Sequence, residues 1–216
     1  MTFDFGRTRV KICGITQIDD ALTSVDHGAD AVGFVFHEPS RRYIDPGKAS
    51  EIIEQLPPFV KTIGVFADEP SDYVLRAYRE SGVDAVQIMD TGRDVPGIPP
   101  SSIIPVVRVG EGNGEVELES LPVDRAVLLD TFVPDSKGGT GVAFDWDIAK
   151  KYAAERRIIV AGGVRPENVA GLIERVRPYG VDVSSGVEDS PGRKDHEKIA
   201  RFLESVRTID EHLRGA

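Results

Sequence analysis

The chain contains a single cysteine, which stands at the end of an apolar run and close to a cation. The stretch reads VKICGIT over residues 10–16, with Lys11 two positions before Cys13. A thiol near positive charge loses its proton more easily, and the thiolate can then do chemistry. A lone cysteine is more often a small buried core residue. Lys11 and the position at a strand end favour a reactive Cys13 with a lowered pKa.

A carboxyl group closes another apolar run, AVLLD over residues 126–130. Alternate side chains of a strand share a face, so Leu128 and Asp130 point the same way, as do Lys11 and Cys13. Asp130 at a strand end can transfer a proton in general acid or base catalysis. Taken alone, Asp130 is equally compatible with a turn or a helix cap. The glycine-rich loop that follows, GGTG over residues 138–141, is a weaker signal.

Two further loops have the composition of phosphate-binding turns. VAGGVRPENV leaves one predicted strand, and DVSSGVEDSPG leaves the last one. Backbone N–H groups at such turns bind phosphate, and the loops after strands seven and eight form the usual phosphate site of a (β/α)8 barrel. Asp182 shares the inward face with Ser184. The candidate phosphate-binding residues are Gly162, Gly163, Ser184, Ser185 and Gly186.

A basic pair lies in the loop HEPSRRYID after the second predicted strand. The planar guanidinium of Arg41 or Arg42 can bind a carboxylate through two hydrogen bonds, although a solvated basic pair is the commoner case. His37 can titrate near neutrality but is more often a plain loop residue. No His, Cys and Asp grouping has metal-ligand spacing, and the chain has no P-loop or dinucleotide fingerprint.

These residues belong to an alternation of short apolar runs and helical patterns, typical of parallel strands buried on both faces. The predicted strands are 10–13, 31–36, 60–66, 85–89, 103–109, 126–130, 158–161 and 181–184. The predicted helices are 17–26, 46–55, 71–81, 147–155, 166–176 and 194–213. Eight βα units in one domain, 1–216, favour a (β/α)8 TIM barrel, with short or missing helices after strands four and five. A doubly wound sheet is the competing fold.

A weak internal repeat supports the alternation. GADAVGFV, GVDAVQIM and GVDVSSG begin at Gly28, Gly82 and Gly180. Each reads as a glycine that ends a helix, a short turn with an aspartate, and a strand. The three copies indicate a repeated αβ unit.

The composition excludes several classes of function. The net charge of −10 and the absence of a dominant basic patch argue against nucleic acid and anionic membranes as partners. The chain has no run of about 18 apolar residues for a membrane helix and no apolar leader. One cysteine cannot form an internal disulfide, so we expect a cytoplasmic protein. With nucleic acid and membranes disfavoured, we expect a small-molecule partner.

Several motifs, taken in order, resemble the phosphoribosylanthranilate isomerase family of tryptophan biosynthesis: KICGIT, GADAVGFVF, SRRYI, LLDT, GGTG with FDW, AGGVRPENV and VDVSSGVEDSPGRKD. The resemblance runs from Val10 to about Arg201. It implies a (β/α)8 barrel and an Amadori rearrangement of N-(5-phosphoribosyl)anthranilate to 1-(2-carboxyphenylamino)-1-deoxyribulose 5-phosphate. It also implies no cofactor and no metal. We expect a monomer or a homodimer, but the sequence does not show which.

The resemblance also implies roles for individual residues. Asp130 is the general acid that opens the ribose ring, and Cys13, as thiolate, is the general base that removes the C2 proton. Arg42 faces the anthranilate carboxylate, Asp182 lies near the sugar hydroxyls, and Lys11 gives electrostatic support. The phosphate lies at the Gly162–Gly163 and Ser184–Gly186 loops.

This sequence departs from the family pattern at Met89, where histidine is common, and at Val142 and Ala143 in the glycine-rich loop. A histidine-pathway barrel isomerase is one alternative, but there we expect an aspartate in place of Cys13. A noncatalytic phosphosugar-binding protein is another, but it does not need both Cys13 and Asp130.

Overall fold

A computed structural model describes residues 6–89, 93–109, 118–131 and 146–215. Eight parallel strands form a closed barrel in sequential order, and β8 closes the barrel on β1 through the register Lys11↔Asp182. The strands are β1 Arg9–Cys13, β2 Ala31–Val35, β3 Lys61–Phe66, β4 Ala85–Ile88, β5 Ile103–Val109, β6 Val127–Thr131, β7 Ile158–Val160 and β8 Gly180–Val183. The predicted barrel is confirmed, and the doubly wound sheet is wrong.

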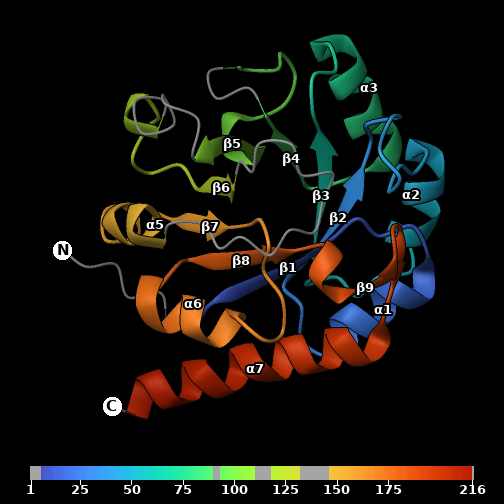
Figure 1. The fold of residues 1–216 in the computed structure, drawn as a ribbon. Helices are drawn as coiled ribbons and strands as arrows, with labels where there is room; N and C mark the ends of the chain where they lie inside the picture. The colour runs from blue at the N-terminus through green and yellow to red at the C-terminus, as the bar shows by residue number, and fades with distance from the viewer. Residues whose placement is uncertain (1–5, 90–92, 110–117, 132–145, 216) are drawn as a thin grey trace.

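Helices surround the barrel, and α7 packs against α1 and α6 (Figure 1). They are α1 Ile18–Asp26, α2 Pro46–Ile53, α3 Ser71–Ser81, α5 Trp146–Ala153, α6 Val169–Val176 and α7 His196–Gly215. Within the described residues, a 3-10 turn (η1, Pro100–Ser102) precedes β5 and a helical turn at residues 118–120 precedes β6. The first segment is short, as predicted, and residues 110–117, which precede the second, lie outside the described residues.

Local sequence signals account for several element ends. Asp45 caps α2, because its side chain accepts hydrogen bonds from the backbone N–H groups of Gly47 and Lys48, and Pro46 fills the first helical position. Gly82 ends α3 in the left-handed region, at φ 71°. The third copy of the internal repeat is different, because Gly180 begins β8 and Arg177, at φ 54°, ends α6.

A short hairpin follows the barrel and was not predicted. A 3-10 turn, η2 (Ser185–Val187), leads into strands β9 Glu188–Ser190 and β10 Arg193–Lys194, which pair antiparallel. Lys194 was expected to begin the last helix. It lies in β10 instead, because the proline and glycine between the two strands turn the chain back toward the barrel.

The strand alternation separates two cores. The large core lies between strands and helices and contains residues such as Ile12, Leu129 and Val181. The small core contains Val106, Leu128 and Ala161, with Met89, Ile104 and Ile159 packed against it. These side chains point inward, as the parity of their strands requires. No helix in the described ranges is both long and apolar enough to span a membrane.

Candidate active site

Lys11 and Cys13 point into the barrel from β1, as predicted. The Nζ of Lys11 lies 2.9 Å from Oδ2 of Asp182 and 3.1 Å from Oε1 of Gln87 on β4, so it reaches across the interior. A glycine on β2 gives the two side chains room. A Cβ on Gly33 would lie 2.8 Å from Cε of Lys11 and 3.0 Å from Sγ of Cys13.

The electrostatics of these buried groups differ from the prediction. Burial raises the pKa of the Cys13 thiol, although Lys11 and Lys194 oppose that change. Burial disfavours the Lys11 ammonium, but the charges of Asp182 and Cys13 outweigh that effect and raise the pKa of Lys11. The expected lowering of the Cys13 pKa is therefore wrong for this structure, because a thiol that is 7% exposed loses most of its solvation.

Asp130 lies at the end of β6, on the opposite part of the barrel wall from β1. It has the parity of Leu128, whose side chain belongs to the small inner core, so Asp130 faces the interior. Its register partner is Arg108 on β5, whose Nη2 lies 3.7 Å from Sδ of Met89. Val142, Ala143 and the glycine-rich loop at 138–141 lie outside the described residues.

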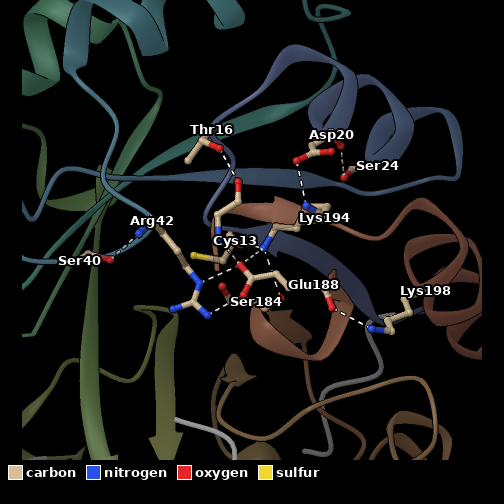
Figure 2. Close-up of polar contacts among 11 residues, drawn as sticks. Cys13, Thr16, Asp20, Ser24, Ser40, Arg42, Ser184, Glu188, Lys194 and Lys198 are labelled. Carbon is tan, nitrogen blue, oxygen red and sulfur yellow. Dashed lines mark hydrogen bonds and ion pairs between the residues drawn. The ribbon is translucent and has the colours of Figure 1, made fainter. Parts of the chain in front are cut away.

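Arg42 lies at the mouth, where an ion-pair network fixes its guanidinium (Figure 2). Its Nε and Nη2 donate to the two carboxylate oxygens of Glu188, at 2.8 and 2.6 Å. A Cβ on Gly14 would lie 2.7 Å from Cδ of Arg42 and 3.1 Å from Oγ of Ser184, so Arg42 and Ser184 both approach the end of β1. Arg41 is exposed.

The two predicted phosphate loops meet each other. Gly162 and Gly163 both adopt positive φ, 80° and 63°, which favours glycine. A Cβ on Gly186 would lie 2.1 Å from the carbonyl oxygen of Val164, so the loop after β8 packs directly on the loop after β7. Asn168 fastens the first loop by donating from Nδ2 to the Gly163 carbonyl.

Two buried polar atoms near these loops lack hydrogen-bond partners among the described residues. They are Oδ1 of Asp182 and Oγ of Ser184. Buried polar atoms are normally satisfied, so an orphaned pair at the end of one strand indicates a place for ligand hydroxyl or phosphate groups. Asp182 on β8 and Ser184 directly after this strand are the two residues predicted to share its inward face, while Ser185 is exposed beyond them.

His37 takes part in a grouping that linear spacing did not reveal. Its Nδ1 lies 2.6 Å from Oε1 of Glu69 and 3.7 Å from Oδ1 of Asp68. These three residues come from the loops after β2 and β3, and their ligand atoms lie within 4.8 Å of one another. The carboxylate of Glu69 also accepts the backbone N–H of Ala67, so the grouping orders the loop after β3.

Sequence reasoning missed three side chains that support the site. Gln87 hydrogen-bonds Lys11, and the inward parity it shares with Met89 was an available signal. Glu188 and Lys194 follow the last strand within a charged segment, but nothing local identifies Arg42 and Cys13 as their partners.

Comparisons with known proteins agree with this geometry. A family model described as N-(5'-phosphoribosyl)anthranilate (PRA) isomerase matches residues 10–205. An N-(5'-phosphoribosyl)anthranilate isomerase of Geobacter sp. strain M21 is 47% identical over 207 residues, which cover 94% of this chain and 99% of that protein.

Solved structures give the same result. The phosphoribosylanthranilate isomerase of Thermotoga maritima superposes with a TM-score of 0.81 at 40% identity, covering 93% of this chain and 99% of that chain. A second structure of this enzyme type, in complex with reduced 1-(o-carboxyphenylamino)-1-deoxyribulose 5-phosphate, superposes with a TM-score of 0.77 at 39% identity, covering 93% and 99%. Because both the family model and the relatives extend over nearly the whole chain, the chain belongs to the N-(5'-phosphoribosyl)anthranilate isomerase family.

Proposed function

We propose that Cys13 is the general base and Asp130 the general acid of the isomerisation that this family performs in tryptophan biosynthesis. The observation that carries the proposal is the inward orientation of both side chains at the carboxyl ends of β1 and β6. The carboxyl ends of barrel strands are where active sites of this fold lie. Groups on separate strands can approach a sugar from different sides.

The reaction rearranges one substrate molecule by opening its ring and exchanging protons with these two side chains. Asp130 donates a proton to the ribose ring oxygen as the C1–O bond breaks, and the nitrogen lone pair forms a C1=N iminium. The Cys13 thiolate then removes the C2 proton. The C–H electron pair forms C1=C2, and the iminium pair returns to nitrogen, which gives an enolamine. Tautomerisation moves a proton from the C2 hydroxyl to C1 and leaves the ketone. No external oxidant is needed, because C1 is reduced as C2 is oxidised.

The remaining site residues fit the groups of such a substrate. The guanidinium of Arg42 can bind the anthranilate carboxylate, and the orphaned Oδ1 of Asp182 can accept a hydrogen bond from a sugar hydroxyl. Lys11 supplies positive charge between Asp182 and the thiol. The ligand of the related complex carries the same carboxylate, hydroxyl and phosphate groups.

Phosphate binding is assigned to the two loops that pack on each other. Gly162 and Gly163 contribute backbone with positive φ, which exposes N–H groups in a concave turn. Ser184, Ser185 and Gly186 contribute the start of the 3-10 turn after β8, where N–H groups are unpaired within the turn. The buried orphaned Oγ of Ser184 supports this assignment.

The expected assembly is a monomer or a homodimer without nucleic acid or membrane partners. A Thermotoga maritima structure, 36% identical, is described as mutually generated monomers of a dimeric phosphoribosylanthranilate isomerase. Sedimentation analysis distinguishes the two states for this chain.

The catalytic assignment is tested by turnover of N-(5-phosphoribosyl)anthranilate, followed as the loss of its fluorescence. Asp130→Asn and Cys13→Ser should each lower kcat by at least about 10², the usual contribution of general acid or base catalysis. Substrate binding and the unfolding transition should change little. A variant with near-normal kcat removes that residue from the mechanism. The larger histidine-pathway substrate, assayed in parallel, should turn over poorly.

A further inference from the structure

Lys194 is a completely buried ammonium group at the edge of the site. Its Nζ donates to three oxygens: the Cys13 carbonyl at 2.6 Å, Oε1 of Glu188 at 2.9 Å and the Ser184 carbonyl at 3.3 Å. Figure 2 shows this ammonium among its partners, and the side chain is 0% exposed. One cation therefore connects the main chain of the candidate base with the main chain of the candidate phosphate loop.

Glu188 connects the same cation with Arg42. Its Oε1 accepts from Nε of Arg42 at 2.8 Å as well as from Lys194, and its Oε2 accepts from Nη2 at 2.6 Å. The carboxylate is 5% exposed. Two parallel hydrogen bonds fix the plane of a guanidinium as well as its position. The hydrogen bonds to Glu188 use Nε and Nη2, and Arg42 is only partly buried.

Protein stability alone does not explain why Glu188 and Lys194 are buried as charged groups. Burying charges is costly, and well-packed apolar side chains in place of a buried ion pair are often neutral or stabilising. The proton transfers written above use neither Glu188 nor Lys194. Apart from a backbone hydrogen bond from Gly192 to Glu188 and the pairing of Glu188 with Lys194, their side chains contact three elements of the candidate site, at Arg42, Cys13 and Ser184.

We propose that Glu188 and Lys194 are positioning residues for the isomerisation: Glu188 aims the guanidinium of Arg42 at the substrate carboxylate, and Lys194 fixes the main chain of Cys13 against the phosphate loop. This inference rests on the proposed roles of Cys13 and Arg42. It assigns no contact with the substrate to either residue.

The charge balance around the thiol agrees with this assignment. The groups that face Cys13 are Lys11 on β1, Asp182 on β8, Lys194 on β10 and Arg42 after β2, with Glu188 between the last two. Three cations therefore accompany two carboxylates. A Cys13 thiolate makes this set neutral, and the charge of Lys194 acts to lower the thiol pKa while burial raises it.

Glu188→Gln gives the first test, because the two side chains have nearly the same shape. Glutamine can accept only one of the two hydrogen bonds from Arg42, so the guanidinium loses its fixed plane. We expect KM to rise by about tenfold or more, with a smaller change in kcat. Arg42→Ala, measured beside it, should raise KM at least as much. The double variant should be no worse than Arg42→Ala alone, because Glu188 then has nothing to aim.

The outcomes separate the two proposals. If Arg42→Ala leaves KM unchanged, the proposed role of Arg42 is wrong. If Arg42→Ala raises KM but Glu188→Gln stays within twofold of the unmodified protein, only the positioning role of Glu188 is wrong.

Lys194→Met gives the second test, with Lys198→Met as the matched control. Lys198 lies four residues further along and donates to the Glu188 carbonyl, without contact with Cys13 (Figure 2). We expect Lys194→Met to lower kcat by about tenfold or more, since small displacements of a reacting group are costly. The pH dependence of Cys13 alkylation by iodoacetamide should move to higher pH. Lys198→Met should change neither quantity.

A folded Lys194→Met protein with unchanged kcat and an unchanged alkylation profile overturns the role of Lys194. Circular dichroism and thermal unfolding report whether the variant folds. If it does not, Lys194→Arg, which retains the charge but not the geometry, takes its place. It should lower kcat while the alkylation profile stays near that of the unmodified protein, and a normal kcat in that variant overturns the positioning role.

Discussion

The two sides of the barrel mouth are built differently. On one side, at β1, β2 and β8, Lys11 pairs with Asp182, and Glu188 pairs with both Arg42 and Lys194. We call this the paired side. On the other side, the described inward side chains at the carboxyl ends of β4, β5 and β6 are Met89, Arg108 and Asp130. We call this the open side, because Arg108 is exposed and Asp130 half-buried.

The difference separates two requirements of one active site. The paired side contains buried charges whose partners were set during folding, so its geometry is fixed before substrate arrives. The open side presents groups to solvent, where their interactions are weak until a ligand excludes water. Substitutions on the paired side should therefore affect both stability and activity, whereas substitutions on the open side should affect activity.

Lys11→Met should have the largest effect on stability. It leaves the 7% exposed carboxylate of Asp182 without its cation, and breaking a buried pair on one side costs about 3–5 kcal/mol. Urea unfolding measures the loss. Adding Asp182→Asn to this variant should recover a large part of it, because no buried charge then remains. A loss below about 1 kcal/mol for Lys11→Met alone means that the pair does not hold the paired side together.

Arg42→Ala should have the next largest effect, and that effect falls on substrate capture. A charge-assisted hydrogen bond to a carboxylate is worth roughly 1.5–3 kcal/mol, which is about 10- to 150-fold in KM. Steady-state kinetics give the value. Arg41→Ala is the control, because Arg41 is the adjacent, exposed arginine. Equal effects at the two positions contradict the assignment of Arg42.

The barrel itself was predictable because its signals are local. Each predicted strand overlaps an observed one, and the ends differ by no more than one residue, since nearly continuous apolar runs mark strands buried on both faces. Strand parity also placed Lys11, Cys13 and Asp182 correctly inside. A terminal helix was expected from residue 194, but it begins at His196, because two short strands form a hairpin first.

Other features depend on contacts between distant parts of the chain. Arg42 and Glu188 are separated by 146 residues, and Lys194 and Cys13 by 181, so no local pattern reveals either pair. The pKa of Cys13 is a similar case. The sequence shows Lys11, whose charge lowers the pKa of the thiol. It does not show the burial of the thiol, which raises that pKa by more.

The alkylation of Cys13 tests that balance directly, because the chain has no other cysteine. The thiolate is the reacting species, so a raised pKa leaves less of it at pH 7. Native protein should react with iodoacetamide more slowly than a simple thiol at pH 7. As long as the pH is below the thiol pKa, each increase of one pH unit should raise the rate about tenfold. Urea-unfolded protein should react as a simple thiol does. A native rate above that of the unfolded protein shows that the cations of the paired side prevail over burial.

Arg108→Met should have the smallest effect on stability and completes the comparison. Arg108 is exposed, and the described contact of its guanidinium is the sulfur of Met89 at 3.7 Å, a weak acceptor. The free energy of unfolding should change by no more than about 0.5 kcal/mol, as for ordinary surface substitutions.

The charge of Arg108 lies at the mouth beside Asp130 on the neighbouring strand, so it still attracts an anionic substrate at long range. We expect kcat/KM to fall a few-fold at low ionic strength and to match the unmodified protein at about 1 M salt, where the Debye length is roughly 3 Å. A stability loss as large as that of Lys11→Met contradicts the division into a paired and an open side. A loss of kcat/KM that persists in high salt instead makes Arg108 a direct substrate contact.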